Sequence, residues 1–352
     1  MSAPLVSICI PNYNNGRYLD ACLQSALGQT YPNTEIVLVD DASSDDSMTV
    51  AERYRDRIAL YRNRSNLGQP LNTNTCVARS RGDYVVILHS DDMLLPNFAA
   101  DLVPLLADHP NVGMAVGERL EIGEQGEPHS IAPFYNTDCI IPGERQAKVF
   151  LFASYLPCQV LLRRTIFERV GGVDERHIVN LDGLLWFKCA LTADVAYVRT
   201  PVSVYRVHGE STTARYNRTI DHMLEYYATL SEMFRQGRGR PYLEQHFEAA
   251  RRRVGQLALR YAHSIFRAGD YDLVQRYLSL ATAFDPLIAD DFSYQTLSYC
   301  TGANTADRQA LYRKLFGSDA PEKRTFSYDP PEGAVRLREH RGTVAAGASH
   351  GR

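Results

Sequence analysis

Two adjacent carboxylates and an imidazole follow an apolar run in the first third of the chain, in the segment His89-Ser90-Asp91-Asp92. The run before them, 84–88, is rich in β-branched residues, which is typical of a strand buried on both faces of a sheet. Ligands of open α/β sheets bind at the carboxyl ends of such strands. Because carboxylates repel free phosphate, phosphate chemistry here requires a divalent cation, and Mg²⁺ or Mn²⁺ suits carboxylate ligands. On this stretch alone, helix capping before Pro96 is an equal alternative.

A second acidic segment follows another apolar run. Residues 35–39 read EIVLV, and Asp40 and Asp41 follow directly. The run LVSICI over 5–10 is followed by a turn-rich loop that contains Pro11 and Tyr13. We expect the acidic segments to converge on one rim of a sheet, since parallel strands end at the same edge. Turn and cap chemistry is the alternative for the acids, and core packing is the alternative for the tyrosine.

Strand and helix signals alternate along the first hundred residues. Apolar residues recur at helical spacing over 18–27, a helix is predicted over 71–81, and 58–61 is a short strand. This alternation predicts an α/β fold with a mostly parallel sheet and helices on both faces. The chain contains neither G-x-G-x-x-G in its first loop nor G-x-x-x-x-G-K-[ST], which argues against a dinucleotide-binding or P-loop enzyme.

Charge and cysteine content restrict the partners. The chain has 38 basic and 41 acidic residues, a formal net charge of −3, so we expect no nucleic-acid partner. Seven scattered cysteines without a C-x-x-C pair indicate reduced thiols in a cytoplasmic protein. The N-terminus lacks the pattern of a signal peptide, and no apolar run approaches the roughly 18 residues of a spanning helix. We expect a soluble protein, at most peripheral at the inner membrane face.

Five segments resemble, in their order and spacing, the nucleotide-sugar domain of family 2 glycosyltransferases, the inverting enzymes of the GT-A fold. They are SICIPNYNNGRYLDACLQSALGQTYPNTEIVLVDDASSD, NLGQPLNTNTCVARSRGDYVVILHSDD, RRTIFERVGGVDE, LDGLLWFKCAL and YRVHGESTT. The resemblance covers residues 4–213. It implies transfer of a sugar from a nucleotide-diphosphate donor to a hydroxyl acceptor, carbohydrate or lipid-linked, usually in polysaccharide or glycolipid assembly.

The resemblance assigns the donor site residue by residue. It implies that Pro11 and Tyr13 hold the nucleobase, that Asp41 hydrogen-bonds the base, and that Asp40 supports the same loop. Asp91 matches a metal-binding acid that also faces the donor.

The remaining metal ligands follow from the same resemblance. Asp92 matches the second metal-binding acid, and His208 matches a histidine that closes over the diphosphate as a further ligand of Mn²⁺ or Mg²⁺. The family usually shows D-x-D-D here, and His89 stands at the first position. A neutral imidazole can still bond a ribose hydroxyl or ligate a transition metal.

Asp182 matches the acid of the family's E-D-x-x-L-W motif and is the implied catalytic base. Leu181 stands in place of the preceding glutamate. Capping of the helix that follows is the alternative for Asp182. Because His89 and Leu181 depart from the pattern, a weakly active or inactive nucleotide-sugar-binding partner subunit is the alternative function. A sugar-phosphate nucleotidyltransferase would require a Gly-rich basic loop after the first strand, which is lacking.

The chain is predicted to divide into a donor and acceptor domain over 1–215, a helical appendage over 216–316 and a disordered tail over 317–352. Helices are predicted over 221–235, 242–268 and 270–283, and residues 258–286 resemble one tetratricopeptide hairpin. The appendage is expected to pack on the first domain or to form a homodimer. Arginines between 235 and 253 indicate either contact with anionic lipid headgroups or a solvated helix face.

Overall fold

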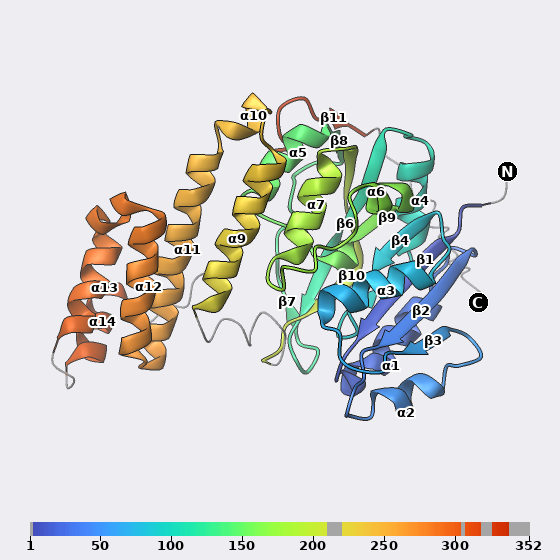
Figure 1. Ribbon diagram of the computed structural model, residues 1–352, viewed down its shortest axis with the longest axis horizontal. Helices are drawn as coiled ribbons and strands as arrows, with labels where there is room; N and C mark the ends of the chain where they lie inside the picture. Colours follow the sequence, from blue (N-terminus) through green and yellow to red (C-terminus); the bar gives the residue numbers. More distant parts are fainter. Residues whose placement is uncertain (1–2, 210–219, 304–306, 318–325, 338–352) are drawn as a thin grey trace, which may run out of the picture.

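One mixed β-sheet with helices on both faces forms the larger part of the molecule, and a stack of helices extends from one side of it (Figure 1). The computed structural model describes residues 3–209, 220–303, 307–317 and 326–337. The predicted α/β class with a helical C-terminal region is confirmed.

The sheet has the strand order β11-β8-β10-β6-β9-β4-β1-β2-β3, with β5 paired to β10 and β7 to β6. Strands β3, β2, β1 and β4 are parallel to one another, and β6 is parallel to β10, whereas β9 runs antiparallel between β4 and β6. The strands are β1 (Val6–Asn12), β2 (Thr34–Asp40), β3 (Ala59–Arg62), β4 (Tyr84–Ile87), β5 (Met93–Leu94), β6 (Val112–Ile122), β7 (Pro128–His129), β8 (Cys139–Ile141), β9 (Val160–Arg163), β10 (Asp194–Arg206) and β11 (Val335–Arg336).

Each face of the sheet buries its own set of helices. Alternate residues of β1 point to opposite faces, since Ile8 packs in the core with α1 and α4 whereas Cys9 packs in the core with α3 and α7. The helices of the sheet domain are α1 (Gly16–Leu27), α2 (Ser47–Glu52), α3 (Gln69–Arg79), α4 (Phe98–Ala107), α5 (Gly143–Phe150), η1 (Pro157–Gln159), α6 (Arg164–Arg169) and α7 (Leu181–Ala190).

The C-terminal helices continue the core of the α7 face. Met223 and Leu230 of α9 are fully buried in the same cluster as Trp186 of α7, so the two regions share one hydrophobic core. The helices are α9 (Asp221–Gln236), α10 (Pro241–Glu244), α11 (Phe247–Ala268), α12 (Tyr271–Phe284), η2 (Pro286–Asp290), α13 (Phe292–Gly302) and α14 (Arg308–Phe316). The predicted helix over 242–268 is therefore interrupted between α10 and α11. The predicted domain boundary at 215 lies outside the described residues.

Three arginines of the predicted basic cluster form ion pairs within their own helices. Arg235 lies against Glu232 of α9, and Arg251 and Arg252 lie against Glu248 of α11. Pairs three or four residues apart are the usual arrangement of a solvated helix face. Among the described residues, we find no helix that combines the length and the apolar composition needed to cross a membrane.

The prediction of a disordered tail is wrong for residues 326–337. Strand β11 pairs antiparallel with β8, and Tyr328 exchanges backbone hydrogen bonds with the segment 134–136, at 2.8 Å to the Phe134 oxygen. This segment is polar and aperiodic, so its own pattern predicts no structure; its hydrogen-bond partners are supplied by a distant sheet edge. Residues 318–325 and 338–352 lie outside the described part of the chain.

Candidate active site

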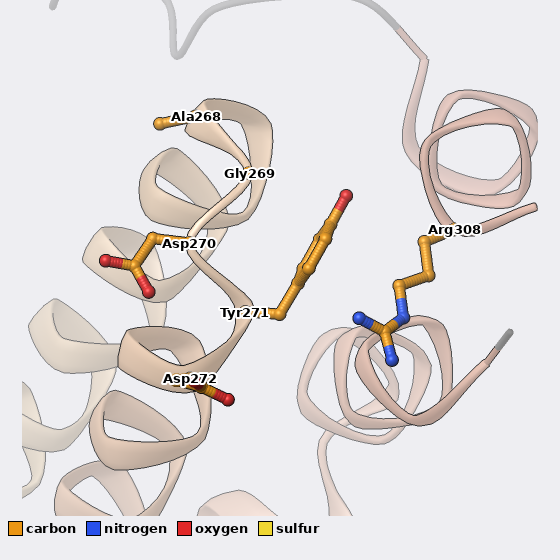
Figure 2. Close-up of a pocket in the computed structure, with 6 residues that line it drawn as sticks. All are labelled: Ala268, Gly269, Asp270, Tyr271, Asp272 and Arg308. Carbon is orange, nitrogen blue, oxygen red and sulfur yellow. The ribbon is translucent and has the colours of Figure 1, made fainter. Parts of the chain in front are cut away.

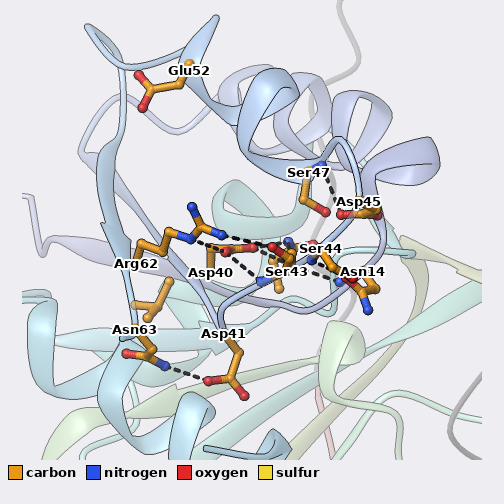
Figure 3. Close-up of polar contacts among 12 residues, drawn as sticks. Asn14, Asp40, Asp41, Ser43, Ser44, Asp45, Ser47, Glu52, Arg62 and Asn63 are labelled. Carbon is orange, nitrogen blue, oxygen red and sulfur yellow. Dashed lines mark hydrogen bonds and ion pairs between the residues drawn. The ribbon is translucent and has the colours of Figure 1, made fainter. Parts of the chain in front are cut away.

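Two loops meet at the carboxyl ends of β1 and β2, and Asp40 joins them (Figure 3). The Asp40 carboxylate is fully buried and accepts hydrogen bonds from the Asn12 side chain at 2.8 Å and from the Ser43 backbone at 3.0 Å. Arg62 of β3 lies 3.4 Å from the same carboxylate. A further hydrogen bond joins the two loops: the Asn14 backbone amide donates to the Ser43 hydroxyl at 2.9 Å. Asp40 therefore supports the loops.

Asp41 holds a third loop, the connection between β3 and α3. Its carboxylate accepts from the Asn63 side chain at 2.8 Å and from the backbone amides of Leu67 and Gly68, each at 2.9 Å. Figure 3 shows the bond to Asn63. Because both oxygens are engaged and the residue is 1% exposed, Asp41 shapes one wall of the sheet edge.

The two predicted base-binding residues differ in exposure. Pro11 is buried inside β1, in register with Val39, so only its backbone faces the loop. Tyr13 follows β1 and is 44% exposed. Its ring is therefore accessible to a planar ligand at the carboxyl end of β1.

The segment after β4 brings an imidazole and two carboxylates together. One potential ligand atom from each of His89, Asp91 and Asp92 lies within 4.8 Å of the others. The turn that carries them is closed by the Asp92 amide, which donates to the His89 carbonyl oxygen at 3.0 Å. Ser90 is held by the Asn15 side chain at 3.1 Å, which ties this turn to the loop after β1. Two carboxylates and an imidazole form a donor set that suits a divalent cation.

Asp91 and Asp92 have opposite electrostatic environments. Burial alone would raise the pKa of Asp91, but the hydrogen bond from His208 at 3.0 Å and the charge of His89 outweigh it and lower the pKa. Burial, followed by the nearby charge of Asp91, holds the pKa of Asp92 well above its usual range. The Arg206 backbone amide donates to Asp92 at 3.0 Å. A cation beside both groups would relieve this repulsion, so the residues present fit a divalent ion.

Asp182 is the second residue of α7, which begins after Asn180 in the left-handed region at φ 59°. Burial raises the pKa of Asp182, and the charge of His89 opposes that rise. The charge of His89 also lowers the pKa of Asp91, so it opposes the effect of burial at both carboxylates. Leu181, at the position of the family's glutamate, is buried in the hydrophobic core.

The tertiary structure adds Arg17 and Glu124, which sequence reasoning missed. Arg17 forms an ion pair with Glu124 at 3.1 Å, and its Nη2 lies 3.5 Å from Nδ1 of His208. The guanidinium groups of Arg17 and Arg206 lie 4.4 and 4.8 Å from the centre of the Tyr18 ring. The only sequence signal was the position of Arg17 directly after the turn that ends β1. Arg17 therefore contacts His208 directly, and both cations lie against the Tyr18 ring, whose centre is 4.9 Å from that of His208.

A pocket of about 500 Å³ lies far from these acids in the chain, at the turn between α11 and α12 (Figure 2). Its lining comprises Ala268, Gly269, Asp270, Tyr271, Asp272 and Arg308. The Arg308 guanidinium lies 4.6 Å from the centre of the Tyr271 ring, and its Nε donates to the Ala303 carbonyl oxygen. The arginine is thus engaged in packing α14 against the turn.

Sequence comparison identifies relatives of known family. A profile described as Glycosyl transferase family 2 matches residues 7–171. An uncharacterized glycosyltransferase of Rickettsia prowazekii is 31% identical over 233 residues, which cover 64% of this chain and 70% of that protein. An uncharacterized protein of Mycobacterium tuberculosis is 32% identical over 243 residues, covering 63% of this chain and 73% of that protein.

Solved structures share the fold at low sequence identity. S. aureus TarS in complex with UDP-GlcNAc aligns with a TM-score of 0.59 and 16% identity, covering 89% of each chain. The mannosyltransferase PcManGT of Pyrobaculum calidifontis, in complex with GDP-Man and Mn²⁺, aligns with a TM-score of 0.54 and 19% identity, covering 91% of this chain and 89% of that one. These similarities extend over the helical region as well as the sheet.

Proposed function

Because the chain belongs to glycosyltransferase family 2, we propose that it is a metal-dependent inverting enzyme that moves a sugar from a nucleotide-diphosphate donor to a hydroxyl group of a carbohydrate or lipid-linked acceptor. Polysaccharide or glycolipid assembly in the cytoplasm is the proposed setting.

The observation that carries this proposal is the cluster of His89, Asp91 and Asp92 after β4, together with Asp182 at the start of α7, where the charge of His89 opposes the rise that burial causes in the pKa of Asp182. Direct displacement at an anomeric carbon requires a base on the acceptor side and charge stabilisation on the side of the leaving diphosphate. Asp182 is the proposed base: it takes the proton of the acceptor hydroxyl as that oxygen attacks. A single displacement inverts the anomeric centre, so one carboxylate suffices.

The donor would lie along the carboxyl edge of β1, β2 and β4. The exposed ring of Tyr13 and the backbone at Pro11 are proposed to contact the nucleobase, with Asp40 and Asp41 holding the loops around it. Structures of similar fold were solved with UDP-GlcNAc and with GDP-Man, which supports a nucleotide-sugar donor here.

The proposed cation is Mn²⁺ or Mg²⁺, held by Asp91 and Asp92 with His208 closing over it. When bound, it would neutralise charge that develops on the departing diphosphate. Arg17 and Arg206, whose guanidinium groups both lie against the Tyr18 ring, are proposed to add positive potential near the cation.

The decisive experiment replaces the proposed base with its amide, Asp182→Asn. Metal-dependent hydrolysis of a panel of UDP- and GDP-sugars should fall at least about 100-fold, the usual contribution of a general base, while donor binding by calorimetry stays unchanged. Asp221→Asn is the matched control because Asp221 occupies the first turn of α9 as Asp182 does in α7. Full turnover by Asp182→Asn would exclude this carboxylate as the base.

A second candidate is a nucleotide-sugar-binding partner subunit with little or no activity. Two departures from the family pattern favour it, the imidazole at His89 and the apolar side chain at Leu181. Tight nucleotide-sugar binding by the native chain without turnover of any donor in the panel would support the subunit over the enzyme.

A further inference from the structure

We propose that His89 is a direct ligand of the cation and makes the site select Mn²⁺ and other transition-metal ions over Mg²⁺. This inference rests on the proposed function in one respect, namely that Asp91 and Asp92 bind a divalent cation. It goes beyond that function because it assigns the metal preference to one side chain in which this chain departs from the family pattern.

The distances suit one shared ion. A potential ligand atom of His89 lies within 4.8 Å of one on Asp91 and one on Asp92. Ligand atoms bonded to one ion at about 2.1 Å are about 3.0 Å apart when adjacent and about 4.2 Å apart when opposite. Only one pair among three ligands can be opposite, so the side chains need to close by up to about 2 Å, which rotation of the imidazole and of the carboxylates can supply.

His89 is restrained at both its backbone and its ring. The His89 carbonyl oxygen accepts from the Asp92 amide at 3.0 Å and faces the Cys22 thiol at 3.8 Å. The ring Nε2 lies 3.3 Å from the side-chain amide of Gln69, the first residue of α3. With the amide turned about its terminal bond, its oxygen accepts from the Nε2 proton, and Nδ1 then carries no proton and can bind a metal. Such a contact orients a metal-binding imidazole.

The loop that carries Gln69 is itself fixed. Asp41 accepts from the backbone amides of Leu67 and Gly68, the two residues before Gln69. Gly68 has φ +86°, a conformation that favours glycine, where the chain turns into α3. The loop held by Asp41, next to the proposed nucleotide site, therefore leads directly into Gln69, which orients the imidazole of His89.

The chemistry of the donor set determines the preference. Mg²⁺ binds oxygen ligands in a strict octahedral geometry and accepts nitrogen poorly, whereas imidazole suits transition metals. An aspartate at position 89 would supply a third carboxylate and one more negative charge. The imidazole removes that charge and adds a nitrogen, which weakens Mg²⁺ more than Mn²⁺.

The test measures metal binding by the full-length chain, independently of turnover. MnCl₂ and MgCl₂ are titrated alone and again with UDP and with GDP, for the native chain, His89→Asp and His89→Ala. We expect His89→Asp to lower the ratio of Mn²⁺ to Mg²⁺ affinity by about tenfold or more. His89→Ala should weaken Mn²⁺ while leaving Mg²⁺ nearly unchanged. Circular dichroism verifies folding, and His89→Asn replaces either variant that fails to fold.

Pulsed electron paramagnetic resonance of bound Mn²⁺ distinguishes the two histidines near the acids. Nitrogen coupling from an imidazole should be present in His208→Gln, which lacks the imidazole of His208, and should be lost in the double variant His89→Ala/His208→Gln. Absence of coupling in His208→Gln, or an affinity ratio unchanged in His89→Asp, would overturn the inference while leaving the cation site intact. A native chain that binds neither ion would overturn both the inference and the cation part of the proposed function.

Discussion

Asp91 and Asp92 are adjacent in the chain, yet their surroundings shift their pKa values in opposite directions. Asp91 gains the hydrogen bond of His208 and the charge of His89, whereas Asp92 is buried beside the charge of Asp91. The residue that favours a cation most is therefore Asp92, since ionising it without a counter-charge costs the most. At the residue scale, the metal-free site carries a free-energy cost that a bound ion would remove.

Replacing Asp92 with asparagine should stabilise the metal-free protein. In the folded state a raised pKa favours the protonated acid, so at neutral pH the ionised carboxylate lowers the free energy of unfolding. Asp92→Asn removes that charge while its amide oxygen still accepts from the Arg206 backbone. We expect a higher free energy of unfolding than that of the native chain in urea denaturation with EDTA.

The same variant should lose the rise in melting temperature that MnCl₂ produces in the native chain. Asp108→Asn, a change at an exposed aspartate after α4, is the control and should alter neither quantity. Lower stability of Asp92→Asn with EDTA would contradict the electrostatic account.

At the scale of elements, α7 positions the proposed base and α5 positions α7. Helix α5 begins at Gly143, whose backbone amide donates to Asp194 at the start of β10 at 2.9 Å. A Cβ at Gly143 would overlap the carbonyl oxygens of Ala190 and Ala193, at the end of α7 and just before β10. Backbone atoms on both sides cannot move apart without shifting α7 itself.

Gly143→Ala should therefore destabilise the protein by about 2 to 3 kcal/mol, as overpacking in a core does, and should reduce turnover by displacing Asp182. Chemical denaturation and donor hydrolysis measure the two effects. Gly302→Ala is the matched control, because a Cβ there meets nothing within 4 Å. Equal stabilities for the two variants would show that α5 and α7 can move apart without a cost in the free energy of unfolding.

A second contact between elements depends on protonation. His263 of α11 links two other helices, with Nδ1 3.0 Å from the Tyr312 hydroxyl and Nε2 2.7 Å from the Ser293 hydroxyl. Burial, with a smaller contribution from the charge of Arg267, lowers the pKa of His263 to about 4. The folded helical region therefore favours the neutral imidazole.

The stability of the helical region should fall as the pH is lowered from about 6.5, the usual histidine pKa, towards 4. In this window the unfolded chain binds more protons, so the slope is at most about 1.4 kcal/mol per pH unit, and solvent screening reduces it. Urea denaturation at about pH 7.5 and about pH 5 should show a smaller loss for His263→Gln than for the native chain. An identical loss in both proteins would exclude protonation of His263 as a cause of the pH dependence.

At the scale of the whole molecule, residues from distant parts of the chain share one core. Trp186 of α7, Leu230 of α9 and Leu297 of α13 are all fully buried in the same hydrophobic cluster. The C-terminal segment adds an edge strand to the sheet, where β11 pairs with β8 and the Tyr328 ring lies 5.5 Å from that of Phe134. In Figure 1 this red segment lies beside β8 and α5.

Truncation after residue 317 should lower the melting temperature by about 2 to 4 °C, because pairing with β8 and the packing of Tyr328 are lost together. A chain that ends at residue 337 is the control, since it keeps every contact of β11. Differential scanning calorimetry compares the two with the full chain. If both truncated chains melt with the full chain, the segment 326–337 adds no stability.

Local pattern was sufficient for several elements of the first hundred residues. The apolar runs before Asp40 and His89 predicted β2 and β4 within one residue, and the stripe over 18–27 lies within α1. Strand β9 was not predicted, because its antiparallel place between β4 and β6 depends on partners far away in the chain. Strand β11 was missed for the same reason.

The sequence by itself determined the types of group at the proposed site: acids and an imidazole where buried strands end, and an acid at the start of a helix. Only the tertiary structure decided that the ligand atoms of His89, Asp91 and Asp92 lie within 4.8 Å of one another. It also decided that the carboxylates of Asp40 and Asp41 accept hydrogen bonds from loops, and that Arg17 reaches His208. The physical reason is the distance along the chain over which each kind of signal acts. Strand burial and helix periodicity are read over a few residues, whereas charge interactions and hydrogen-bond partners depend on distances that only the packed chain defines.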